Sequence, residues 1–112
     1  MPDAWHIAEN GATIGQQGSE QGVIERDEEH ELGARISLER GCRVAPLAIT
    51  CGIYGWMMHT RFFGSQEEAL AQYEAMKNRL HELLLEAEKT AQEDGGKRVL
   101  FDGVARFVED YP

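Results

Sequence analysis

Residues 65–93 read SQEEALAQYEAMKNRLHELLLEAEKTAQE, and this stretch decides the fold. Its apolar residues recur at three- and four-residue steps, which is the spacing of one face of an α-helix. They are Leu70, Tyr73, Met76, Leu80, Leu83, Leu84, Ala87 and Ala91. Ser65 and Glu68 have the spacing of a capping box, in which each side chain accepts a hydrogen bond from the other residue's N–H. The sequence therefore predicts one long amphipathic helix, which the glycines at 95 and 96 end.

Three pairs of short apolar segments precede this helix and predict antiparallel strands. The pairs are residues 5–9 with 12–15, 23–27 with 34–40, and 47–53 with 56–63. Asn10-Gly11 and Tyr54-Gly55 supply turns for the first and third pairs. After the long helix, residues 97–101 predict a short edge strand, and Asp102 the N-cap of a short C-terminal helix. We therefore expect a single α+β domain over residues 1–112, an antiparallel β-meander of five to six strands with the long helix packed on one face.

The turn at Tyr54-Gly55 decides which side chains face the helix. A two-residue loop places Cys51 opposite Met58 on the face that receives the helix. Thr50, His59 and Arg61 then share the second face with Met57 and Phe63. Apolar residues on both faces indicate strands central to the sheet, or a second surface that a partner covers.

Composition excludes several classes of partner. The chain has 20 acidic and 11 basic residues and a net charge of −9, so we expect no nucleic-acid partner. No apolar run approaches the ~20 residues of a membrane span, and the N-terminus lacks a secretory signal, so we expect a cytoplasmic protein without membrane contact. In that reducing compartment Cys42 and Cys51 are free thiols.

Three residue sets are candidates for chemistry, each with a structural alternative. Thr50, His59 and Arg61 present hydroxyl and cationic groups that could bind a small anion, or could be the rim of an interface. Oxygen and nitrogen ligands for a divalent cation lie close together in a predicted acidic loop, at Asp27, Glu29 and His30. The alternative is a solvated hairpin tip. Cys51 and His59 would form a nucleophile and base only if the turn shifted by one residue. The alternative is that Cys51 is a buried, inert cysteine.

The length of the predicted helix bears on assembly. About 28 residues span roughly 42 Å at 1.5 Å per residue, whereas a compact domain of this size is about 34 Å across. The apolar side chains beyond the midpoint, Leu83 to Leu85, are therefore exposed unless something covers them. A homodimer would cover them. The alternative is that the C-terminal helix folds back over that end.

These observations predict a small acidic interaction module that self-associates as a homodimer, possesses no catalytic chemistry, and binds another protein. No cofactor-binding or catalytic motif occurs in the sequence, so we expect no cofactor. The alternative is a small-ligand (anion) binding or hydrolytic protein that uses the face of Thr50, His59 and Arg61. A third hypothesis is an antagonist of a basic protein, which would bind residues 25–31 and the acidic helix face.

Overall fold

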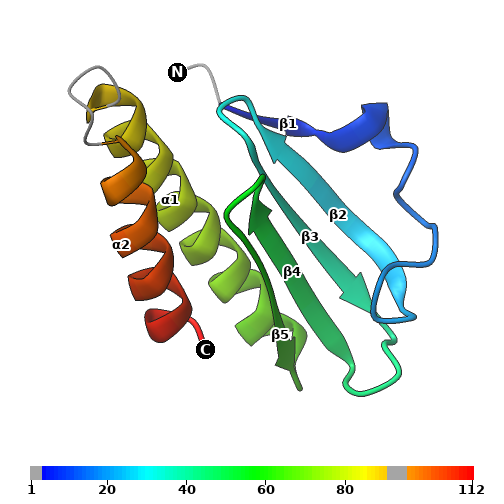
Figure 1. Ribbon diagram of the computed structural model, residues 1–112. Helices are drawn as coiled ribbons and strands as arrows, with labels where there is room; N and C mark the ends of the chain where they lie inside the picture. The colour runs from blue at the N-terminus through cyan, green and yellow to red at the C-terminus, as the bar shows by residue number, and fades with distance from the viewer. Residues whose placement is uncertain (1–3, 91–95) are drawn as a thin grey trace.

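The computed structural model describes residues 4–90 and 96–112, which form one antiparallel sheet with two helices on one side (Figure 1). The strands follow chain order across the sheet. They are β1 (Trp5–Ile7), β2 (Val23–His30), β3 (Ala34–Arg40), β4 (Leu47–Ile53) and β5 (Met57–Phe63). A short 3₁₀ turn, η1 (Ala8–Gly11), follows β1, and the helices are α1 (Gln66–Thr90) and α2 (Gly96–Asp110). The predicted α+β class, meander, long helix and short C-terminal helix are confirmed.

The core lies between α1 and the central strands. The predicted helix stripe is buried at Tyr73, Met76, Leu80 and Leu84, against alternate residues of β3 and β4. Those strand residues are Ala34, Ile36, Leu38, Leu47, Ile49, Cys51 and Ile53. At the start of α1, the Glu68 N–H donates to the Ser65 hydroxyl at 3.2 Å, as the capping box predicts. The burial of these apolar side chains orients the helix on the sheet.

The predicted hairpin at Asn10-Gly11 is wrong. Glu9 and Asn10 both adopt positive φ (48° and 55°), so the chain turns one residue early, and residues 12–15 form no strand. β1 pairs instead with β2, with Trp5 opposite His30. An isolated two-stranded hairpin is marginally stable in water, whereas β1 becomes part of a larger and more stable sheet when it pairs with β2. In this arrangement Trp5 is buried and Ile7 is exposed.

The predicted turn at Tyr54-Gly55 is also wrong by one residue. Tyr54, Gly55 and Trp56 form a three-residue loop, in which Gly55 has a φ of +82°. β4 and β5 therefore pair with Thr50 opposite Thr60 and Cys51 opposite His59. Because a shift of one residue moves every side chain of a strand to the other face, the alternation of β5 is reversed relative to the prediction.

The C-terminal segment is helical from Gly96, so the predicted edge strand at residues 97–101 is wrong. α2 runs antiparallel to α1 and covers Leu83 and Leu84, which confirms that the C-terminal helix folds back over this end. Gly103 permits the close approach, since a Cβ atom there would lie 2.1 Å from Leu83 Cδ1. The predicted last residues of the long helix, 91–93, and Gly95 fall outside the described part of the chain.

Candidate functional site

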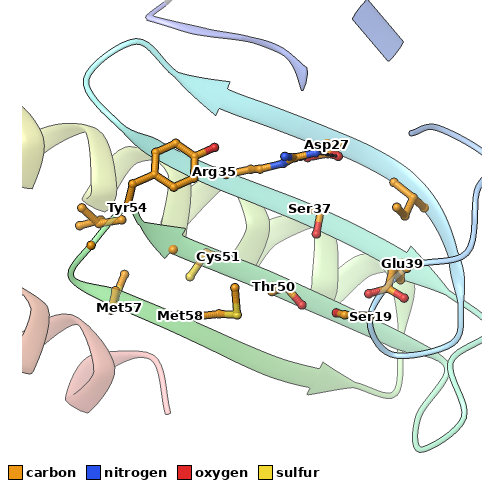
Figure 2. Close-up of a pocket in the computed structure, with 15 residues that line it drawn as sticks. Ser19, Asp27, Arg35, Ser37, Glu39, Thr50, Cys51, Tyr54, Met57 and Met58 are labelled. Atoms are coloured by element: carbon orange, nitrogen blue, oxygen red, sulfur yellow. Dashed lines mark hydrogen bonds and ion pairs between the residues drawn. The ribbon is translucent and has the colours of Figure 1, made fainter. Parts of the chain in front are cut away.

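The second face of the sheet, which we call the open face, lies opposite the face that α1 and α2 cover and is hollowed at its centre (Figure 2). The hollow has a volume of about 460 Å³, within the usual range for small-molecule sites. Its floor consists of small residues, Ser37, Thr50 and Gly52, on the two central strands. Arg35 and Tyr54 border it on one side and Met58 on the other. Small side chains between large ones therefore produce the hollow.

Asp27 and Arg35 form an ion pair at the rim of the hollow. The guanidinium donates two hydrogen bonds to the Asp27 carboxylate, at 2.9 and 2.7 Å, and the Thr13 hydroxyl donates a third at 2.7 Å. Burial alone would raise the pKa of Asp27, but these hydrogen bonds and the Arg35 charge outweigh it, so the pKa is lowered. Arg35 also donates to Glu9 at 3.0 Å, which ties η1 to the sheet.

A second buried carboxylate, Glu39, fixes the loop that closes one end of the hollow. It accepts hydrogen bonds from the N–H groups of Glu20 and Gly22, both at 3.2 Å. A Cβ atom at Gly18 would lie 2.3 Å from this carboxyl group, so a larger residue there would displace the Glu39 side chain. Both buried carboxylates of the open face are therefore bonded within the chain.

The three predicted metal ligands do not converge. The predicted acidic loop is the end of β2, so its side chains alternate between the two faces of the sheet. Asp27 and Glu29 lie on the open face, where Glu29 accepts a hydrogen bond from the Tyr54 hydroxyl at 2.9 Å. His30 faces α1, where its Nε2 lies 2.7 Å from Nδ1 of His81. Among residues 4–90 and 96–112, no group of three or more ligating side chains could hold a metal ion.

The predicted anion-binding residues are divided between the two faces. Thr50 is on the open face, with its hydroxyl 3.2 Å from that of Thr60. His59 and Arg61 face the helices and bind the end of the chain: His59 Nε2–H donates to the Tyr111 carbonyl, and Arg61 Nε donates to the Pro112 carbonyl at 3.0 Å. The prediction that these three residues share one face is therefore wrong.

Cys51 and His59 lie opposite each other on β4 and β5, the arrangement that a shifted turn would give. However, both side chains lie between the sheet and the helices rather than on a solvent-exposed surface, and Cys51 is buried. Burial raises the pKa of the Cys51 thiol to about 12, despite the opposing effect of the Arg61 charge. The thiol is therefore protonated at neutral pH, which is the wrong state for a nucleophile.

The outer edge of β5 is a feature that the sequence patterns did not predict. This strand is the last of the sheet, and on its open face Met58 is 83% exposed and Phe62 is 43% exposed. None of its seven residues is acidic, in a chain with 20 acidic residues. That absence of acids from residues 57–63 is the signal that could have identified this edge from the sequence.

Comparison with known proteins found no matching family, no matching curated protein and no matching solved structure. Within the part of the chain that the structure describes, no helix is both long enough and apolar enough to cross a membrane. The open face and the β5 edge are therefore the candidate functional surfaces of the chain.

Proposed function

We propose that this chain is a non-catalytic interaction module that associates with other protein through the outer edge of β5, and that it self-associates as a homodimer. A single observation supports the proposal most directly: β5 is a seven-residue edge strand with apolar side chains exposed on it. An unpaired strand edge presents a row of N–H and C=O groups that can pair with a further strand.

The two edges of the sheet differ in how they are protected. β1 has only three residues, and a very short edge strand is a common protection against unwanted pairing. β5 has neither proline nor lysine, and its open face presents Met58, Thr60 and Phe62, without a charge. An unprotected edge of this length favours a role in binding.

The arrangement of reactive groups supports a non-catalytic role. Cys51 is protonated and buried, and the His59 ring is bonded to a backbone carbonyl at the end of the chain. The proposal also places the chain in the reducing cytoplasm. Both cysteines are free thiols, which is consistent with that compartment.

Size-exclusion chromatography with light scattering tests the proposal. We expect the wild-type chain to run as a dimer at micromolar concentration and Met58→Lys to weaken the assembly more than about tenfold, because the ammonium group would be desolvated in the interface. Val44→Lys is a matched control, since Val44 is 76% exposed and lies in the β3–β4 connection. A wild-type monomer that also retains no protein partner in a pull-down would contradict the proposal.

The hollow of the open face favours a second candidate, a small-ligand binding protein. Its polar floor and the apolar wall at Met58 suit an uncharged ligand with hydroxyl or amide groups. Titration of a metabolite mixture, followed by the NMR signals of the Thr50 and Met58 methyl groups, tests it. Signals that do not move at millimolar ligand would remove this candidate.

A further inference from the structure

α2 extends beyond the sheet. Figure 1 shows it beside α1 with no strand in front of it, whereas α1 packs against β3, β4 and β5. α2 packs along α1, and its end reaches the sheet through the bonds of His59 and Arg61 to Tyr111 and Pro112. In a two-layer α/β arrangement each helix packs against a sheet. The space over α2, on the outer side of β5, therefore lacks the strands that would complete the sheet layer.

The uncovered side of α2 has an apolar stripe of its own. Phe101, Ala105 and Val108 follow at four- and three-residue steps, and all three are exposed, Phe101 by 69%. Gly103 faces α1, and Ala105 is two residues or about 200° further around the helix, on the opposite side. The stripe therefore points away from α1, and Tyr111, which bonds to β5, is only about 60° around the helix from Val108, so the stripe lies on the β5 side of α2.

We infer that the β5 edge and the α2 stripe are two layers of a single surface, and that its occupant is a second copy of this chain. This inference rests on the proposed function and specifies its partner and geometry. Pairing β5 with β5 of the other copy continues the sheet over both α2 helices, and the two stripes then meet beneath the joined strands. A strand pair alone is marginally stable, so contact in the helix layer is what makes such an interface sufficient.

Symmetry fixes the pairing of the two strands. A twofold axis perpendicular to the sheet keeps both helix layers on one side, so an open-face residue must pair with an open-face residue. All seven residues of both strands are paired only when Thr60 faces Thr60 of the other copy. Met58 then faces Phe62 of the other copy on each side of the axis, an apolar pair in place of two exposed side chains.

The charge distribution gives a basic partner no specific site on β5. Two chains of net charge −9 repel each other as a whole, but β5 has no acidic residue, so contact between two β5 strands brings no carboxylates of these strands together. The one permanent charge of β5, on Arg61, faces the helices and is bonded to the Pro112 carbonyl and to Gln72. A partner selected for basic charge would have no carboxylate on this strand to bind.

Thiol crosslinking tests the register directly. In a Cys42→Ser background, Thr60→Cys should be captured as a covalent dimer by a short bis-maleimide, because identical residues face each other at the axis. Val44→Cys, exposed in the β3–β4 connection, should give no comparable dimer. Met58→Cys should crosslink far more efficiently when mixed with Phe62→Cys than by itself.

Light scattering on Phe101→Glu tests the helix layer, with Arg106→Glu as the control, since Arg106 is exposed on the same helix but lies at least about 100° around it from the stripe. We expect Phe101→Glu to raise the dissociation constant at least about tenfold, and Arg106→Glu to have a much smaller effect. A dimer that neither crosslinks at Thr60 nor responds to Phe101→Glu and Met58→Lys would overturn both the inference and the proposed function. A monomer that binds a different protein, in a manner that Met58→Lys abolishes, would overturn the inference alone.

Discussion

Replacing Asp27 by Asn removes the negative charge from the side chain that joins β2, β3 and the loop after η1. Asp27 is 3% exposed and accepts two hydrogen bonds from Arg35 and one from Thr13. A hydrogen bond to a charged group contributes about 1.5–3 kcal/mol, and breaking a fully buried pair costs about 3–5 kcal/mol. Arg35 retains Glu9 and is partly exposed to water, so we expect Asp27→Asn to lower the free energy of unfolding by about 2 kcal/mol at pH 7.

The pH dependence of this loss has a defined sign. The folded-state pKa of Asp27 is lowered, because the hydrogen bonds from Arg35 and Thr13 and the Arg35 charge outweigh burial, which would raise it. A lowered pKa gives stability that is fully present above the unfolded value of about 3.9 and is lost as the pH falls through the folded value. The difference between wild type and Asp27→Asn should therefore be largest at pH 7 and shrink below about pH 4.

Urea denaturation at a series of pH values measures this difference. Glu9→Gln is the control, since Glu9 pairs with the same guanidinium but is 58% exposed, and we expect it to change stability by less than about 1 kcal/mol. A loss below about 0.5 kcal/mol for Asp27→Asn at pH 7, or a loss that stays constant into the acid range, would refute the reasoning.

Three further predictions follow from packing and burial. Cys51 should resist thiol reagents at pH 8 in the folded chain and react on unfolding, as mass spectrometry can show; rapid labelling of folded protein would contradict its burial. Gly103→Ala should destabilise by about 1 kcal/mol, since overpacking against Leu83 exceeds the gain in helix propensity, and a more stable variant would contradict this. Lys77→Met should lower the free energy of unfolding by about 2 kcal/mol, because Glu28, 2.6 Å from the ammonium, would lose its cation; unchanged denaturation would contradict this.

The long helix was predictable because its signals are local. Ser65 and Glu68 lie three residues apart, and the apolar stripe repeats within a single segment, so no distant contact is needed to recognise it. The strand at residues 34–40 was predictable for the same reason, because its alternation lies within one segment, whereas the pairing of β1 with β2 was not.

The register of β5 was not predictable from its sequence. Met57 and Phe63 face the helices while Met58 and Phe62 face the open side, so both faces are apolar and the period of two identifies no inner face. Tertiary contacts decide instead: in this register Phe63 is buried in the core, and His59 and Arg61 reach the end of the chain. The acceptors in those contacts are carbonyl oxygens about 50 residues away in the sequence, so no local spacing indicates them.

The same two-sided composition gives the strongest reason to expect a partner at β5. A strand that is apolar on both faces is normally covered on both. The helices cover the side of Met57 and Phe63, but the loop after η1 bonds to Glu39 on β3 and leaves Met58 and Phe62 exposed. Within residues 4–90 and 96–112, no further segment covers this strand, and we propose that a partner does so. The apolar residues on both faces of β5 leave its register ambiguous from the sequence, and they are also the residues that a partner strand would cover.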